Sequence, residues 1–167
     1  MDNQALSAET NKVIYSYYLC LINILKESNI DIFPLLKQHD LPINLQKLSN
    51  HPHSLKQFYA VIKGAIKLYK LEGLGLLFGK SMKLSDYGIL GYALLSCANV
   101  LQAIGYASKF SSMTTDQINV ELKIEKNSAI IIFHDTNTQY WPQPFLQEEC
   151  LSESWHTFTF LLPELEH

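Results

Sequence analysis

The feature that most constrains the fold of this chain is an apolar stretch from Leu71 to Ser96, which holds five of the seven glycines. These are Gly73, Gly75, Gly79, Gly88 and Gly91. Glycine costs backbone entropy inside regular structure, so it is kept where the backbone turns sharply or where another backbone comes close. We therefore expect this stretch to turn tightly or pack closely, deep in a core.

Within this stretch, Gly79-Lys80-Ser81 matches the second half of a phosphate-binding P-loop. That motif needs four residues between its first glycine and this group, and the required position holds Leu74. A dinucleotide fingerprint would need glycine where Phe78 stands, and both motifs follow a strand, whereas the preceding segment is helical in pattern. We interpret the glycines as packing residues.

The length and charge of the chain narrow the class further. A chain of 167 residues fits one globular domain, and a net charge of −3 argues against binding a phosphate backbone unaided. Polar residues interrupt every apolar run before membrane-spanning length, and no signal segment opens the chain. The widely spaced Cys20, Cys97 and Cys150 lie among apolar residues, which indicates buried thiols in a reducing cytoplasm.

The first third of the chain has the pattern of helices joined by polar turns. Residues 1–10 are polar and are expected to be frayed or disordered, whereas residues 11–26 carry apolar side chains at helical spacing. Asn29 is suited to end this helix in the left-handed conformation. A short helix is expected over residues 31–39, followed by a loop over residues 41–53.

Two further helices flank the glycine stretch. Ser54 begins the first through a capping box, and its lysines are expected to form a solvated face. Asn99 with Gln102 begins the second. The apolar residues of this second helix that are expected to face inward are Leu101, Ile104 and Phe110.

The periodicity changes at Ile118. Apolar and polar residues alternate over 118–125, which predicts a half-buried strand, and the continuous apolar run 129–133 predicts a more deeply buried partner in a hairpin. A last helix is expected after residues 141–144, with an inward stripe of Leu151, Trp155, Phe158 and Leu162. This order predicts the α+β class, with helices packed on a small antiparallel sheet.

Together these segments resemble a known family. The residues that carry the resemblance are Leu74-Gly75-Leu76 with Phe78-Gly79, the string Gly88-Ile89-Leu90-Gly91-Tyr92-Ala93-Leu94-Leu95-Ser96, and Val100-Leu101-Gln102-Ala103-Ile104 before the hairpin. Over residues 11–164 the chain resembles the amino-terminal effector domain of AraC-type bacterial transcription regulators of the arabinose-binding-like branch. The resemblance implies a sensor that binds a small molecule and often dimerises. In such regulators a carboxy-terminal pair of helix-turn-helix units binds DNA.

The chain departs from that family in two ways. It has no helix-turn-helix segment, and the family's sheet usually continues beyond the position of Leu162. We therefore expect a chain that is cut within or just after the sensor domain, with residues 165–167 as a purification-tag remnant. A sheet edge left bare by such a cut favours pairing with another copy, so we expect a homodimer.

An effector pocket of this kind is mostly apolar and aromatic, with a few polar groups that fix orientation. We expect the last helix and the second strand to wall it, although core packing is the commoner role of a buried aromatic. The candidate ligand-binding residues are Tyr92, Phe133, Trp141 and Trp155 as walls and His134 and His156 as polar anchors. Because few charged residues fall on the apolar faces, a neutral or amphipathic effector such as a fatty acid is expected.

Two other functions stay open on the sequence: a ligand-free oligomerisation module with a filled core, and a haem or metal sensor with an axial histidine. Glu153 and His156 have the spacing of a helical metal half-site, but no second such pair is present. His51 and His53 could chelate a metal, yet no partner ligand accompanies them. No motif of a known catalytic site occurs, so no enzyme, catalytic residue or cofactor is predicted.

Overall fold

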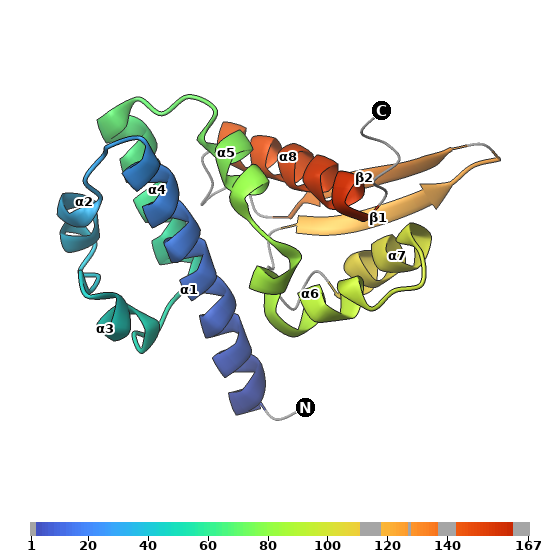
Figure 1. Ribbon diagram of the computed structural model, residues 1–167, viewed down its shortest axis with the longest axis horizontal. Coiled ribbons are helices and arrows are strands. Elements are labelled where there is room, and N and C mark those ends of the chain that lie inside the picture. Colours follow the sequence, from blue (N-terminus) through green and yellow to red (C-terminus); the bar gives the residue numbers. More distant parts are fainter. Residues whose placement is uncertain (1–2, 111–117, 127, 137–142, 162–167) are drawn as a thin grey trace.

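The fold is taken from a computed structural model, which describes residues 3–110, 118–126, 128–136 and 143–161 (Figure 1). The chain is helical up to Phe110, continues as a β-hairpin and returns to a long helix. The elements are α1 (Asn3–Glu27), α2 (Phe33–Gln38), α3 (Leu45–Ser49), α4 (Leu55–Tyr69), α5 (Leu74–Ser81), the 3-10 turn η1 (Leu84–Tyr87), α6 (Gly88–Leu95), α7 (Val100–Phe110), β1 (Ile118–Ile124), β2 (Ala129–Asp135) and α8 (Gln143–Leu161). The predicted α+β class is confirmed.

The elements gather into two regions with α5 and α8 between them (Figure 1). On one side, α1 to α5 and the first part of α8 bury a large apolar cluster, which we call the main core. On the other side, α6 and α7 bury the apolar side chains of Leu90, Leu94 and Ala103. We call these three residues, together with the partly buried residues packed on them, the small cluster. The hairpin extends beyond the second region as an antiparallel pair.

The main core is organised around packed aromatic rings. The ring centroid of Phe58 lies 5.5 Å from that of Tyr17 and 5.8 Å from that of Phe78. Phe78 in turn lies 5.4 Å from Phe145, at the start of α8. Contacts at this spacing add to the burial of each ring, so α1, α4, α5 and α8 are held together by one set of side chains.

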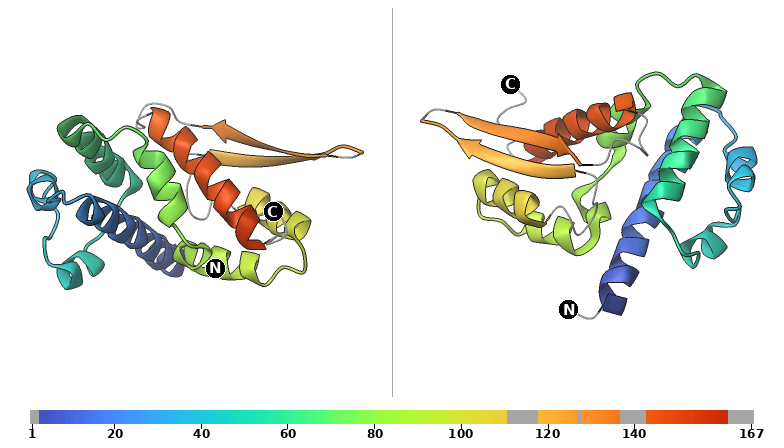
Figure 2. Two further views of the ribbon diagram at one scale, coloured as in Figure 1. Left: turned by 45° about the horizontal axis from the view of Figure 1, so that its top comes forward. Right: turned by 180° about the vertical axis from the view of Figure 1, so that it is seen from behind.

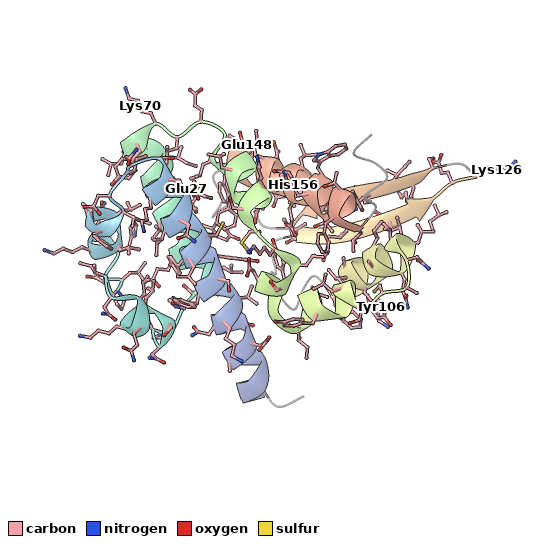
Figure 3. The ribbon with its side chains drawn as sticks, viewed as in Figure 1. Glu27, Lys70, Tyr106, Lys126, Glu148 and His156 are labelled. Carbon is pink, nitrogen blue, oxygen red and sulfur yellow. The ribbon has the colours of Figure 1, made fainter. Side chains whose placement is uncertain are left out.

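The glycines of α5 allow its backbone to lie directly against α8, as all views of the ribbon show (Figures 1 and 2). A Cβ added to Gly75 would overlap the carbonyl oxygen of Phe145, and one added to Gly79 would lie 2.5 Å from that of Glu149. The N–H of Gly75 donates to the Glu148 carboxylate at 3.1 Å, where the two helices meet (Figure 3). The expected close approach of backbones is confirmed here.

The expected tight turns are also confirmed, at Gly73 with φ of 72° and at Gly88 with φ of 59°. Both values lie in the region of positive φ, which glycine adopts at no steric cost and most other residues adopt rarely. The expectation of a deep core holds for α5 but is wrong for α6. That helix keeps Ile89 and Tyr92 largely exposed, because the described elements cover only its opposite face.

The sequence signals at helix ends agree with the structure at three places. Asn29 is left-handed with φ of 56°, the Ser54 side chain accepts a hydrogen bond from the N–H of Gln57, and Asn99 accepts one from the N–H of Gln102. Each signal acts within one turn of chain. Such local hydrogen bonds form in the same way whatever the tertiary contacts are.

Two helical segments were not predicted. Helix α1 begins at Asn3 and includes residues expected to fray, where the Glu9 carboxylate accepts a hydrogen bond from the N–H of Ile89 at 3.0 Å. Helix α3 lies inside the expected loop, capped by Asn44 and anchored by the fully buried Leu48. The first contact joins segments 80 residues apart and is invisible to a local pattern.

The hairpin is confirmed, with Ile118 paired to Asp135 and Ile124 to Ala129. The prediction that β2 is the more deeply buried strand is wrong, since Ile130 and Phe133 are exposed at 41% and 37%. The apolar run supplies both faces of β2 with apolar side chains. In the described structure only one of those faces lies against other elements.

The predicted inward faces of α7 and α8 are also wrong in part. Leu101 is 51% exposed, Leu151 is 67% exposed and Trp155 is 59% exposed. Helix α8 instead buries Phe145, Leu146, Glu149 and Cys150. The contact with the glycine face of α5 fixes the rotation of α8 about its axis, and this contact outweighs the apolar stripe.

Candidate functional site

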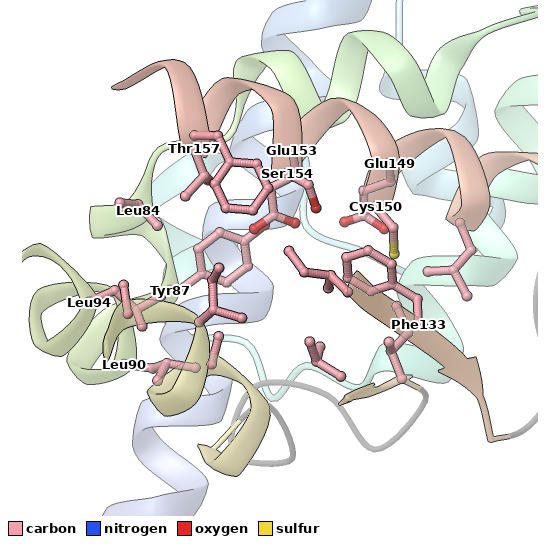
Figure 4. A pocket seen from close by; sticks show the side chains of 18 of the residues that line it. Leu84, Tyr87, Leu90, Leu94, Phe133, Glu149, Cys150, Glu153, Ser154 and Thr157 are labelled. Carbon is pink, nitrogen blue, oxygen red and sulfur yellow. The ribbon is translucent and has the colours of Figure 1, made fainter. Parts of the chain in front are cut away.

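A cavity of about 160 Å³ lies where the two regions meet, partly open to the surface (Figure 4). Its lining comes from η1, α6, α7, both strands and α8, with Tyr17 of α1 and Tyr59 of α4 at its inner side. Most of the lining is apolar and includes Leu84, Leu90, Leu94, Ala107, Ile131 and Phe133. A hollow of this size between several elements suits a small organic molecule.

The polar groups of the cavity concentrate along α8. Glu149 and Glu153 are one turn apart on the same face of this helix and both project into the cavity, with Tyr87 of η1 across from Glu153 (Figure 4). Glu149 and Tyr87 are each only 9% exposed. Part of the Glu153 side chain stays accessible, but protein surrounds its carboxyl group.

The two carboxyl groups titrate far from their ordinary range. Burial raises the pKa of Glu149 well above its ordinary value, and the neighbouring charge of Glu153 raises it further. Burial raises the pKa of Glu153 to about 7, and the Tyr87 hydroxyl acts against this shift. The hydroxyl and the Glu153 carboxyl thus influence each other although their geometry falls short of a hydrogen bond. Near neutral pH this end of the cavity therefore holds protons.

The six residues predicted for the site are scattered. Phe133 lines the cavity, whereas Tyr92 points outward from α6 with 61% of its surface exposed and Trp155 points outward from α8. His134 lies on the exposed hairpin, with Nε2 at 2.6 Å from the Glu121 carboxylate. His156 borders a different pocket, and Trp141 lies outside the described residues. Helix α8 and strand β2 both border the cavity. Apart from Phe133, the residues through which they do so are not the predicted ones.

Sequence reasoning missed the importance of Glu149, Glu153 and Tyr87. A signal for the two glutamates exists in the spacing of α8. Leu146, Glu149, Cys150 and Glu153 follow one another at helical intervals, so two carboxyl groups fall within a buried face. Tyr87 carries no comparable signal, because its place depends on the turn at Gly88.

The histidines considered for a metal pack against other side chains. The His53 ring lies 5.1 Å from that of Tyr18 and 5.6 Å from that of His51, and its Nε2 is 2.8 Å from the carbonyl oxygen of Leu48. Burial lowers the pKa of His53. Among the described residues, no group of three His, Cys, Asp or Glu could hold a metal ion.

The structure also bears on the predictions about buried cysteines and about membrane-spanning segments. Cys20 and Cys150 are buried free thiols as predicted, whereas the free thiol of Cys97 is only partly buried. None of the described helices combines the length and the apolar character that a membrane span requires.

Two comparisons relate the chain to known proteins. Residues 30–165 match the family described as "Arabinose-binding domain of AraC transcription regulator, N-term". The chain is also similar to the ornithine utilization regulator of Pseudomonas aeruginosa, with 27% identity over 126 residues. That match covers 75% of this chain and 37% of the regulator, so the chain corresponds to a minor part of its relative's length.

Proposed function

Because the chain belongs to the arabinose-binding-domain family of AraC transcription regulators, we propose that the cavity beside α8 is its effector site. Members of this family are effector-binding domains of regulators, and a small-molecule site is the feature that such a domain needs. The single observation that carries the proposal is the cavity itself. Its walls are mostly apolar, and its polar groups lie mainly along α8.

The position of the cavity explains how an effector would act. A bound molecule would touch Tyr17 of the main core and Leu90 and Leu94 of the small cluster at the same time. Its binding energy would therefore favour one arrangement of the two regions over others. In the full regulator, that preference would pass to a DNA-binding part outside this chain, in the bacterial cytoplasm.

Homodimerisation belongs to the same proposal. In the part of the chain that the structure describes, β1 and β2 pair only with each other, which leaves the outer edge of each strand without a partner strand. Such edges favour pairing with another chain. Sedimentation equilibrium of the 167-residue chain tests this point, and a monomer at all concentrations would contradict it.

The effector site is tested by a thermal-shift screen of small molecules, with ornithine included because the relative is named for its utilization. A ligand at 100-fold excess over its Kd adds about 2.7 kcal/mol to stability. Ala107→Phe places a ring in the cavity and is expected to abolish the shift, whereas Leu101→Phe adds the same ring on the exposed face of α7 and should keep it. Equal shifts in both variants would contradict the proposal.

A further inference from the structure

The α8 side of the cavity carries two carboxyl groups and a tyrosine hydroxyl, with no basic side chain among the described lining residues. Glu149 and Glu153 project from α8, and the Tyr87 hydroxyl approaches from η1 (Figure 4). That hydroxyl is buried and has no hydrogen-bond partner among the described residues. Buried polar groups are nearly always hydrogen-bonded, so a hydroxyl placed at the cavity wall beside Glu153 is suited to accept a hydrogen bond from a bound ligand.

The lining of the cavity disfavours several classes of ligand. No lysine or histidine is among the described lining residues, and the sequence contains no arginine. A carboxylate or phosphate ligand would therefore meet two acidic groups and no cation. A sugar would bury many hydroxyls against walls such as Leu90, Leu94 and Phe133, which offer them no hydrogen bonds.

An ammonium group fits where these ligands fail. It carries three N–H donors, and its positive charge suits a site with two carboxylates and a hydroxyl oxygen. Because the rest of the lining is mostly apolar, the remainder of the ligand should be apolar as well. The cavity of about 160 Å³ is close in size to apolar cavities of about 150 Å³ that bind benzene.

We propose that the effector is a small cationic amine with an apolar body, held at its ammonium group by Glu149, Glu153 and the hydroxyl of Tyr87. The proposal rests on the function proposed above for this cavity. From the sequence, we expect a neutral or amphipathic effector because few charged residues fall on the apolar faces. The present proposal keeps an amphipathic effector and gives its polar head a positive charge.

Binding of a cation should release protons. The titratable groups facing the pair are Tyr17 and Cys20 of α1, Tyr59 of α4, Tyr87 of η1 and Cys150 of α8, and the lining from α6, α7 and the hairpin is apolar. None of these groups supplies a positive charge, so the carboxyls hold protons when the cavity is empty. Burial raises the pKa of Glu153 to about 7, and amine affinity should therefore increase as the pH rises from 6 to 8.

The test uses three probes of matched shape and different charge: benzylamine, benzyl alcohol and benzoate. Titration calorimetry of the 167-residue chain at pH 8 is expected to give benzylamine an affinity about tenfold or more above the other two. Glu149→Gln and Glu153→Gln should each remove most of this preference. Glu27→Gln, a matched change on the exposed surface of α1, should keep it. At pH 6, benzylamine binding should release protons to the buffer and benzyl alcohol binding should not.

The other possible outcomes contradict the proposal, and they also show whether the proposed effector cavity fails with it. Binding of benzyl alcohol or benzoate as tight as that of benzylamine, and lost in Ala107→Phe, would leave an effector cavity without a preference for cations. Benzylamine binding unchanged by both glutamine variants would show that the carboxyls do not hold it. If no probe bound at millimolar concentration, or if Ala107→Phe changed nothing, the proposed cavity function would fail as well.

Discussion

The two regions of the molecule bury apolar surface in different ways. The main core is filled by rings in contact, such as Phe58, Phe78 and Phe145, and by backbone packed on backbone at Gly75 and Gly79. Among the described residues, the small cluster buries just three side chains, and a cavity lies beside them. We infer that the first region supplies most of the stability and that the second supplies the cavity proposed to hold a ligand.

The largest effect that tests this contrast is the loss of a ring. Phe78→Ala removes a side chain that is fully buried among three other rings, and it should destabilise the chain by about 3–5 kcal/mol. Leu90→Ala in the small cluster should cost only about 2 kcal/mol, since its neighbourhood is already open. Urea unfolding followed by circular dichroism measures both values. Phe160→Ala on the exposed side of α8 is the control, and a larger loss for Leu90→Ala than for Phe78→Ala would break the comparison.

The next effect concerns the contact of α5 with α8. Gly75→Ala places a Cβ against the carbonyl oxygen of Phe145 and should destabilise by about 3 kcal/mol. Gly105→Ala on α7 is the matched control, because its Cβ meets open space, and it should stabilise by up to about 1 kcal/mol. If both variants unfolded at the same urea concentration, α5 and α8 would not pack as closely as described.

A smaller effect of opposite sign is expected in the cavity. The pKa of Glu153 is raised from its ordinary 4.5 to about 7, so the folded state binds this proton more tightly than the unfolded state does. Stability should therefore fall as the pH rises through this range. Glu153→Gln should raise stability at pH 8 by about 2 kcal/mol and have little effect near pH 4. A variant less stable than the parent at pH 8 would mean that the ionised carboxylate has a partner in the folded chain.

The smallest effect is expected at the exposed tryptophan of α8. Trp155→Ala should change stability by less than about 0.5 kcal/mol in the monomer and leave benzylamine affinity unchanged, because the side chain points away from the cavity. Phe133→Ala, which shortens a cavity wall, should weaken binding measurably. Calorimetric titration of both variants makes the comparison, and the reverse order would move the ligand to the outer face of α8.

The sequence predicted those parts of the structure that depend on neighbours along the chain. Asn29 and Ser54 act within one helical turn, and the hairpin follows from the alternation of apolar and polar residues and from a short turn. These features can therefore be predicted from the sequence. The rotation of α8 about its axis cannot be predicted in this way, because it depends on glycines of α5 that lie far away in sequence. The apolar stripe through Leu151 and Trp155 was therefore assigned to the wrong side of the helix.

The same limit applies to the site. Phe133 could be proposed because it is an aromatic residue of the strand expected to wall the pocket, but the cavity is formed only when α7, the hairpin and α8 come together. From the sequence, Glu153 is considered only as half of a metal site with His156, and Glu149 is given no role of its own. The structure shows that both glutamates lie on the cavity wall near the buried hydroxyl of Tyr87, and this position is the reason for interpreting them as ligand-binding residues.

The most direct test of the account is a titration of methyl-labelled protein with benzylamine, followed by NMR. The methyl groups of Leu90, Leu94 and Ile131 line the cavity, whereas those of Leu36 and Leu48 lie in the main core away from it. The account predicts saturable shifts for the first three, with the last two unchanged. Shifts confined to the main core or to the outer face of α8, or no shifts at all, would contradict it.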